Sequence, residues 1–413
     1  MKKIVLTTLI FPLFLCADNL KTLLEYATQT NHLIKAAELN IQASQSELKS
    51  IQKSYYPTID AAAFYQRDDQ PTPFYPGTTY GATAKISWDI YDGGKKSFLK
   101  KEKKERLLGA KASKKYTQKS LFLSITKSFF NIKTLQASLK AQEEAQTALQ
   151  AQLKRVKAFY AANLATSDDV NRLQAAFEKQ NYTIESLKLK IFSLKKALEL
   201  EVGREITPLQ ESHFKKTLTQ KAQRLESTEL LIHRKNALQN LSKSIESSYY
   251  PNIKIEDSYT FFGYAKRPYF SGKPIPLLDE QNKISATLSL RVFDFGTLRQ
   301  KKEVLKLQAA ALQEEISYKS KEQKINITIS RKRITTAKLN IESTRSALKA
   351  AKETLHTITK KYKAGIVDNV VYLDALATHT AAKALYEKSR NDLEIAYALY
   401  YYYNAKNLEE FLQ

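Results

Sequence analysis

The chain has 413 residues, of which only 10 are glycine and 10 are proline, and it carries a formal net charge of +24. Sparse glycine and proline favour long uninterrupted elements and argue against a fold of many short strands and turns. The five histidines are scattered without a pair at metal-ligand spacing, and there is no Gly-rich phosphate loop, so the sequence gives little support to an enzyme.

The first 17 residues are predicted to be a secretory signal peptide. A basic start is followed by an apolar run at residues 4–15 and by Ala17, a small residue at a cleavage point. Cleavage there removes Cys16, the only cysteine, and leaves a mature chain without thiols. The alternative is lipid attachment at Cys16.

A basic block follows further along, where residues 95–119 hold 11 basic residues against two acidic ones. Such a block could bind nucleic acid, but export by a signal peptide argues against that partner. We interpret it as a solvated helix face, which could also meet anionic polymers of the cell envelope. No later stretch is apolar over the length of a transmembrane helix, although strands can cross a membrane with a weaker signal.

The sequence is duplicated. Segments 54–57, 86–94 and 159–164 return as 248–251, 288–296 and 361–366. The first pair is offset by 194 residues and the other two by 202, so 8 extra residues lie between the first two signals of the second half. A period this long indicates a duplicated half and not a short solenoid unit.

The repeat gives the predicted organisation. The parts are a first structural repeat at 18–202, a linker at 203–224, a second repeat at 225–405 and a C-terminal tail at 406–413. Within the repeats, strand hairpins are expected at 57–92 and 251–294, and helical hairpins have their tips at 163–168 and 363–368.

Each half begins with a helix and continues with strands. The first helix is predicted from Leu20 to Lys53, because a residue before a proline, here Pro57, is disfavoured in a helix. Apolar and polar residues then alternate from Tyr80 to Ile90 and again from Ile284 to Val292. The strand after Pro251 alternates as well, with Asp257 interrupting its apolar face.

Ten residues of alternation are the length that a tilted strand needs to cross a bilayer. The predicted lipid-facing residues are Ile86, Trp88, Leu288 and Leu290. The opposite face carries Thr83, Lys85, Ser87, Asp89, Ser285, Thr287, Ser289 and Arg291, and we expect it to line a lumen. The alternative is an ordinary antiparallel sheet with one face on a soluble core.

Long helices follow the strands. Residues 95–162 contain no proline, which allows a helix of about 100 Å. Apolar residues step by three and four over 170–198, with Gln180 as the one polar member, and again over 341–362. Such heptads indicate that each long helix pairs with the helix after its tip.

The tips contain Asn163 and Gly365, which tolerate a left-handed helix end. Ser167 or Asp168 is expected to cap the following helix in the first half, and Asp368 in the second. The pair Asp168-Asp169 is therefore interpreted as part of a cap and not as an acid–base pair.

Four strands cannot close a pore, because an open sheet edge in hydrocarbon leaves backbone groups unpaired and an eight-stranded barrel is filled by its side chains. Several chains must therefore contribute. Three chains would give twelve strands, which is enough for a water-filled lumen.

The chain resembles the TolC family of outer-membrane efflux proteins over nearly its whole mature length. The resemblance is carried by the paired Tyr-Tyr-Pro signals, by Asp-x-Gly at 92–94 and 294–296, by Lys-Tyr-Lys-Ala-Gly at 361–365 and by Leu-Asp-Ala at 373–375. It implies a mixed α+β membrane protein. The expected assembly is a homotrimer whose 12-stranded β-barrel, with four strands per chain, continues as a long periplasmic coiled-coil α-barrel.

The resemblance also implies a location in the cell outer membrane with a large periplasmic portion. The chain would be a passive exit duct of a tripartite efflux or type I secretion system, opened at its tip by a periplasmic adaptor (membrane fusion) protein and an inner-membrane RND or ABC transporter. Outer-membrane lipid is a further expected partner, while no cofactor, metal or nucleic acid is expected. The alternative is a periplasmic coiled-coil scaffold or adaptor without a pore, and drugs, metals and proteins all stay open as cargo.

Gate residues follow from the same resemblance. Tyr362 matches a tip tyrosine, Asp169 its acidic partner on the neighbouring hairpin, and Asp374 an acidic ring at the constriction, with Asp168 beside them. Val367 and Val371 stand where family members can carry a basic residue and a second acidic ring, so fewer charged links are expected here. The tip residues expected to contact the adaptor are Asn163, Leu164, Gly365, Ile366 and Val367.

Overall fold

The computed structural model describes residues 18–70, 72, 76–218, 221–265 and 269–413. The signal peptide expected at residues 1–17, with the choice between cleavage and lipidation at Cys16, lies outside the described residues. The chain forms two compact units. One contains the residues up to Ala37, 114–226 and 320–413, and the other contains 38–113 and 227–319.

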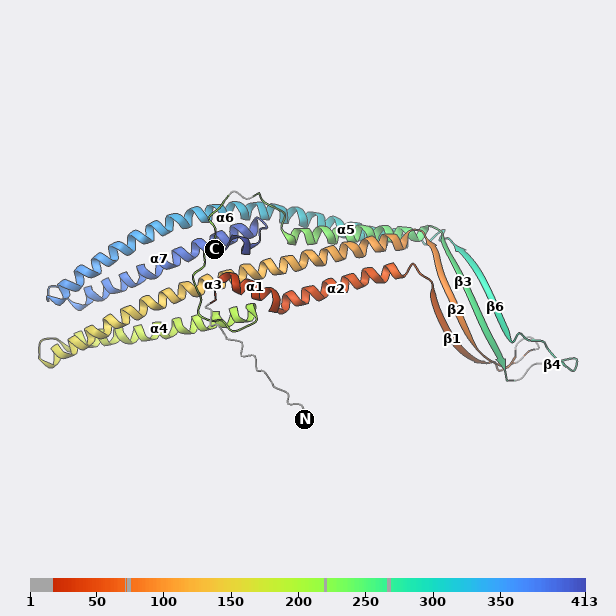
Figure 1. Ribbon diagram of the computed structural model, residues 1–413, viewed down its shortest axis with the longest axis horizontal. Helices are drawn as coiled ribbons and strands as arrows, with labels where there is room; N and C mark the ends of the chain where they lie inside the picture. Colours follow the sequence, from red (N-terminus) through yellow and green to blue (C-terminus); the bar gives the residue numbers. More distant parts are fainter. Residues whose placement is uncertain (1–17, 71, 73–75, 219–220, 266–268) are drawn as a thin grey trace, which may run out of the picture. The chain divides into compact units, whose positions relative to one another are not determined.

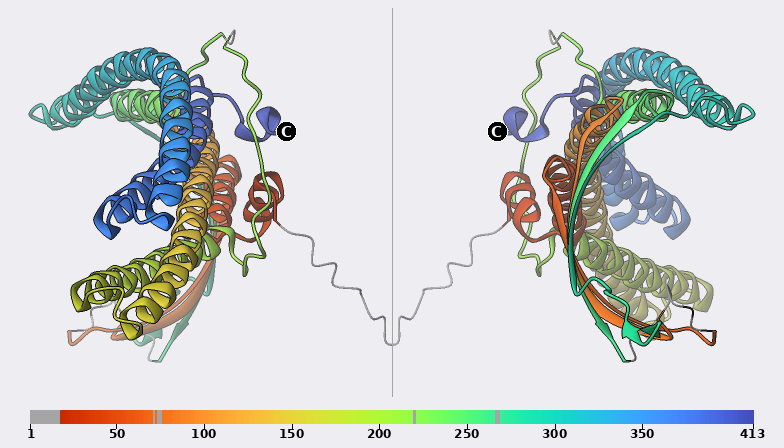
Figure 2. Two further views of the ribbon diagram at one scale, coloured as in Figure 1. Left: turned by 90° about the vertical axis from the view of Figure 1, so that its left-hand side faces the viewer. Right: turned by 90° about the vertical axis from the view of Figure 1, so that its right-hand side faces the viewer.

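The second unit is built on an antiparallel sheet of four strands in the order β1-β2-β3-β6 (Figure 1). Its strands are β1 (Thr58–Arg67), β2 (Thr78–Asp92), β3 (Asn252–Tyr264) and β6 (Glu280–Ser289). The hairpins of the two repeats therefore lie side by side through β2 and β3. The view from the strand side in Figure 2 shows that the sheet is curved.

The connection between β3 and β6 is longer than the one between β1 and β2 and contains a small hairpin of β4 (Tyr269–Phe270) and β5 (Lys273–Pro274). The 8 extra residues of the second half were predicted to lie between the Tyr-Tyr-Pro and Asp-x-Gly signals. They are taken up here, in a longer β3 and this longer connection.

One strand boundary was predicted wrongly. Strand β6 ends at Ser289, which pairs with Asn252, so Leu290 and Arg291 follow the strand instead of belonging to it. The next partner in the register would be Pro251, which has no N–H to donate to the ladder. Leu290, predicted as a lipid-facing strand residue, is exposed but lies outside β6.

The register of the four strands places apolar side chains on one face of the sheet. Directly opposed residues point to the same side, and one such row joins Ile59, Ile86, Asp257 and Ile284. The three isoleucines are exposed, so in the part of the chain that the structure describes no soluble core covers them. Asp257 interrupts this face, as the sequence indicated.

The other face of the sheet is polar. Glu256 lies at its centre, with its carboxylate 3.5 Å from the ammonium of Lys85 and 2.9 Å from that of Lys254. The hydroxyl of Ser87 donates to Glu256 at 3.1 Å, and the hydroxyls of Thr83 and Thr260 lie 2.9 Å apart. Polar residues of β2 and β3 bind one another here, which suits a surface that faces water.

The helices are long, as the sparse glycine and proline predicted. They are α1 (Leu20–Thr30), α2 (His32–Lys53), α3 (Lys95–Ala161), α4 (Ser167–Val202), α5 (Glu226–Glu246), α6 (Thr297–Lys363) and α7 (Asn369–Tyr403), with short 3₁₀ turns η1 (Ser247–Tyr249) and η2 (Leu408–Phe411). Helices α3 and α6 each contain 67 residues.

The single helix predicted from Leu20 to Lys53 is in fact two helices, because Asn31 adopts an extended conformation. Its side-chain oxygen accepts the N–H of Leu33 at 2.8 Å and thereby caps α2. Its side-chain nitrogen donates to the carbonyl of Glu201 at 2.7 Å. This bond to a distant segment stabilises the break, and local sequence could not reveal it.

The predicted helix pairing is confirmed in both hairpins. In the first, Gln180 of α4 donates to the backbone and side-chain oxygens of Gln142 in α3 at 2.8 and 2.7 Å, which explains the polar residue in its heptad. In the second, the hydroxyls of Thr344 in α6 and Ser389 in α7 lie 2.9 Å apart in a buried site.

The main hydrophobic core of the first unit lies around the end of α7. Tyr397, Tyr400 and Tyr401 are fully buried there, and the Tyr400 hydroxyl donates to the carbonyl of Leu218 at 2.5 Å. The linker after α4 runs beside α1 and the C-terminal segment (Figure 2). Phe214 of this linker is buried and forms an antiparallel β-bridge with Leu412.

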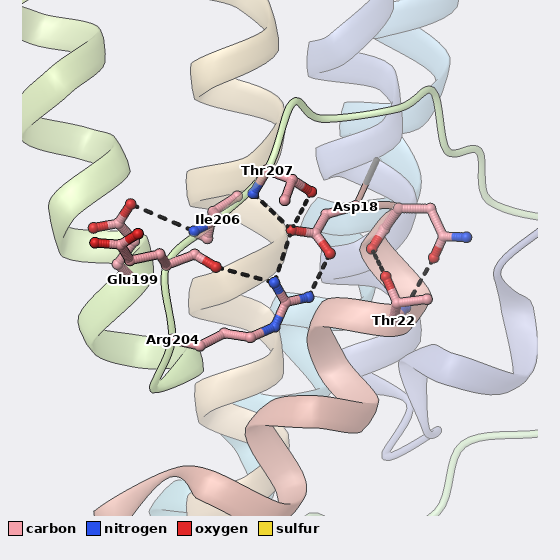
Figure 3. A network of polar contacts seen from close by, with 8 residues as sticks. Asp18, Thr22, Glu199, Arg204, Ile206 and Thr207 are labelled. Carbon is pink, nitrogen blue, oxygen red and sulfur yellow. Dashed lines mark hydrogen bonds and ion pairs between the residues drawn. The ribbon is translucent and has the colours of Figure 1, made fainter. Parts of the chain in front are cut away.

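A polar cluster at Asp18 fastens the start of the described chain (Figure 3). The carboxylate of Asp18 binds the guanidinium of Arg204 through both oxygens. It also accepts the backbone N–H and the hydroxyl of Thr207, each at 2.9 Å. Burial raises the pKa of Asp18, but these hydrogen bonds outweigh it and hold the pKa below its usual value.

Candidate functional site at the hairpin tips

The tip of the first hairpin is a tight reversal between α3 and α4. Asn163 adopts the left-handed conformation that the sequence predicted, with φ of 57°. Thr166 is the cap of α4, because its hydroxyl accepts the N–H of Asp169 at 3.2 Å. The prediction that Ser167 or Asp168 caps this helix is therefore wrong.

Asp169 closes the capping box from the other side, because its carboxylate accepts the N–H of Thr166 at 3.2 Å and the Thr166 hydroxyl at 2.7 Å. A carboxylate in the first turn also interacts favourably with the helix dipole. Asp168, one residue earlier, is exposed and pairs with Arg172 of its own helix at 2.7 Å.

The tip of the second hairpin is simpler. Gly365 is left-handed with φ of 74°, and Asp368 caps α7 by accepting the N–H of Val371 at 3.0 Å. Both features were predicted. Leu164 of the first tip and Ile366 of the second are strongly exposed, while Val367 is half-buried.

Near the tips, two polar contacts join the first hairpin to the second; further from the tips, Lys383 binds Glu144 and Asn391 donates to Thr134. The guanidinium of Arg155, in α3, donates to the carbonyl of Lys363 at 3.0 Å. That carbonyl belongs to the last turn of α6, where helix carbonyls lack partners within the helix and attract cations. The side-chain nitrogen of Asn369, in α7, donates to the carboxylate of Asp169 at 3.1 Å.

Tyr362 occupies a different position from the one expected of a direct partner of Asp169. Its ring stacks on that of Tyr372, with centroids 5.0 Å apart and an angle of 14° between planes. Burial raises the pKa of Tyr362, Arg155 lowers it and Asp169 raises it, so both charged groups lie within electrostatic reach of the phenol. The carboxylate of Asp169 accepts its hydrogen bonds from Thr166 and Asn369.

Asp374 is exposed on α7, two residues beyond the buried Tyr372. It lines a groove of about 370 Å³ between α6 and α7 together with Val371 and several alanines. The side chain is therefore free to face other chains or solvent.

Sequence reasoning missed Arg155, Asn369 and Tyr372. Tyr372 could have been found, because Tyr362 and Tyr372 lie at equal distances from Val367 and residues so placed in a hairpin face each other. Asn369 could not, since its partner Asp169 belongs to the other hairpin. Arg155 could not, since its partner is a backbone carbonyl that carries no sequence signature.

The described residues contain no group of three or more His, Cys, Asp or Glu side chains placed to hold a metal ion. Helices that are both long and apolar enough to cross a membrane are likewise missing from the part of the chain that the structure describes.

Known proteins share both the sequence pattern and the fold. The family described as outer membrane efflux protein matches residues 23–201. The fold is similar to the CmeC outer membrane channel of Campylobacter jejuni, with 13% identity, 95% of this chain and 86% of that chain covered, and a TM-score of 0.82.

VceC, an outer membrane protein of Vibrio cholerae, has 15% identity, coverage of 94% of this chain and 96% of that chain, and a TM-score of 0.78. A membrane protein from Pseudomonas aeruginosa has 15% identity, 93% coverage of each chain and a TM-score of 0.81. No curated protein gives a significant sequence match.

Sequence match and fold agree: residues 23–201 match the model of the outer membrane efflux protein family, and the fold of the chain is similar to that of solved outer-membrane channels. The resemblance is confirmed, as are the predicted fold of the single chain, with its four-stranded sheet and long helical hairpins, and the location in the outer membrane with a large periplasmic part. At identities this low the solved structures establish the fold, while the family match carries the function of an outer-membrane exit duct for efflux.

Proposed function

We propose that the chain is the outer-membrane exit duct of a tripartite export system and that three copies close into one pore. The observation that carries this proposal is the sheet, which has one exposed apolar face, one polar face and two edge strands, β1 and β6. In hydrocarbon an unpaired edge leaves N–H and C=O groups without partners. Pairing β6 of one copy with β1 of the next satisfies both edges.

Three copies give twelve strands, and the polar face around Glu256 then lines the lumen. Eight strands, from two copies, would leave an interior filled by side chains. In this arrangement Ile86, Trp88 and Leu288 face lipid. Trp88 also donates its ring N–H to the carbonyl of Tyr55 at 2.9 Å, which suits an aromatic side chain near a membrane surface.

The gate is proposed at the tips. The Arg155–Lys363 and Asp169–Asn369 contacts hold the two hairpins of each chain together in the closed state. A periplasmic adaptor that binds the exposed tip, formed by Asn163, Leu164, Gly365, Ile366 and Val367, would compete with these contacts and let the hairpins separate. The energy would come from an inner-membrane pump of the RND or ABC type.

Asp374 is proposed to form an acidic ring at the constriction, where three carboxylates would attract cations and resist anions. Tyr362 supports the closed tip through its stacking on Tyr372. Asp168 stabilises the first turn of α4 together with Arg172.

The proposal is tested by reconstituting the detergent-extracted protein in planar bilayers. Discrete channel openings are the expected result. A folded trimer that inserts without any openings would contradict the pore and favour a coiled-coil scaffold.

A further inference from the structure

The two places where a strand passes into a long helix repeat one hydrogen-bond pattern. In the first, Asp92 accepts the N–H groups of Gly94 at 3.1 Å and Lys96 at 2.7 Å. In the second, Asp294 accepts those of Gly296 at 3.1 Å and Leu298 at 2.9 Å. The Asp-x-Gly signal is therefore the turn that starts α3 and α6, and we call these turns the two junctions.

The junctions differ at the middle position of the signal. Gly93 and Phe295 are both left-handed, with φ of 69° and 53°. The first junction needs glycine, because an added Cβ would lie 2.4 Å from the carbonyl oxygen of Ser247. The second has a phenylalanine in a conformation that disfavours side chains, and this side chain is 92% exposed. A strained backbone at Phe295, whose ring is exposed, indicates that the ring has a function.

Phe295 is part of an exposed apolar surface. Phe293 packs edge-on against it, with ring centroids 4.7 Å apart, and is itself 71% exposed. Leu290 and Val292 complete the segment, and both are exposed as well. Four exposed apolar side chains within six residues are unusual on a surface that faces only water.

Basic side chains outnumber acidic ones at both junctions. Residues 91–106 hold seven basic side chains against three acidic ones, and residues 290–306 hold five against two. The exposed ones are Lys95, Lys100, Lys101, Lys104, Arg106, Arg291, Arg299, Lys301 and Lys306. The loops at the other strand ends are nearly neutral, since 66–79 carries one basic and two acidic residues.

We propose that the junctions bind anionic phospholipid head groups at the membrane surface next to the helices. The rings of Phe293 and Phe295 insert between acyl chains, while lysines and arginines of both junctions bind lipid phosphates. Charge complementarity favours this occupant, because the next copy, which pairs with β6 in the proposed trimer, has the same net charge and would not neutralise the cations. The inference rests on the proposed membrane-spanning sheet and names one lipid class that holds it in place.

The test compares lipids added to the full mature chain in detergent. The thermal midpoint is measured with dioleoylphosphatidylglycerol or dioleoylphosphatidylcholine in the micelles, at low and high salt. We expect the anionic lipid alone to raise the midpoint, and high salt to remove this rise because it screens exposed charges. The variant Lys100→Gln/Lys101→Gln/Arg299→Gln/Lys301→Gln should lose at least half of the rise.

A matched control changes four exposed lysines away from the junctions, Lys190→Gln/Lys338→Gln/Lys349→Gln/Lys352→Gln, and should keep the full rise. An equal rise with both lipids, or an equal loss in the control, would overturn the proposal. Channel openings in planar bilayers report on the pore itself, so failure of the lipid inference and failure of the proposed function are distinguishable.

Phe295→Gly supplies a second variant that is expected to fold, because the equivalent residue of the first junction is Gly93. It should leave the midpoint in pure detergent unchanged or higher, since left-handed strain is relieved, while reducing the rise caused by the anionic lipid. If it instead breaks the trimer into single chains, a second copy covers this ring and the lipid proposal is wrong.

Discussion

The core around the end of α7 and the hairpin tips belong to the same compact unit but are stabilised differently. In the core, Tyr400 and Tyr401 are fully buried and bind the backbone of the linker. At the tips, the bond between Arg155 and Lys363 is exposed, and a net hydrogen bond of this kind contributes only about 0.5–1.5 kcal/mol. The polar contacts at the tips are therefore weak, and the hairpins are also joined there by an apolar cluster that includes Leu173 of α4 and Tyr372 of α7.

The largest effect is expected from a change in the core. Tyr401→Ala removes a ring that stacks on Phe411, with ring centroids 4.0 Å apart. It also removes a hydroxyl that donates to the carbonyl of Lys215. It should lower the free energy of unfolding by about 3–5 kcal/mol, measured by urea unfolding followed by circular dichroism. Tyr401→Phe keeps the ring and should cost only about 1 kcal/mol. Equal losses in both variants would mean that ring packing contributes little.

The Asp18 cluster is the next strongest contact. Asp18→Asn leaves Arg204 without its carboxylate and should cost about 2–4 kcal/mol at neutral pH. The folded-state pKa of Asp18 is lowered, so its stabilisation is fully present above the unfolded value of about 3.9 and is lost as the pH falls through the folded value. Unfolding measured from pH 7 downward should therefore show a constant difference between wild type and variant above about pH 3.9 and a narrowing difference below it. A difference that stays constant below that pH would contradict the assignment.

At the tips, Thr166→Ala removes the cap of α4 and should cost about 1 kcal/mol. Thr166→Ser keeps the hydroxyl and is the control. Hydrogen exchange of the first turn of α4 measures the effect locally, and faster exchange is expected only in the alanine variant. If both variants exchange alike, the capping box does not stabilise the tip.

The smallest effect on stability is expected at Asp374, which is exposed. Asp374→Asn should leave unfolding unchanged but weaken the cation selectivity of the reconstituted pore, because the ring of carboxylates is lost. The reversal potential in a salt gradient measures this selectivity. An unchanged reversal potential would exclude the acidic ring.

Much of the architecture could be predicted from the sequence, because periodicity and punctuation are local properties. The alternation of apolar and polar residues predicted four strands, and the heptads predicted the helical hairpins. Asn163 and Gly365 predicted the two tips. The break at Asn31 could not be predicted, because the bond to Glu201 that stabilises it crosses 170 residues. The end of β6 depends in the same way on Pro251 of another strand.

The candidate gate was predicted less well. Asp169 was expected to be the partner of Tyr362, and its carboxylate binds Thr166 and Asn369. Contacts between hairpins depend on how two helix pairs are placed, and a single sequence contains this information only through a family resemblance. Here the family's pattern is altered at Val367, and the guanidinium comes from Arg155 on another helix.

The central claim is that contacts between the hairpins, and not those within a hairpin, keep the channel closed. Single-channel recordings of Arg155→Gln/Asn369→Ala test it directly, with Arg172→Gln/Asn181→Ala as the control. The control removes contacts within the first hairpin, where Asn181 accepts from Gln146. We expect a higher open probability and conductance in the first variant and wild-type behaviour in the control. Wild-type conductance in both variants, or equal increases in both, would contradict the account.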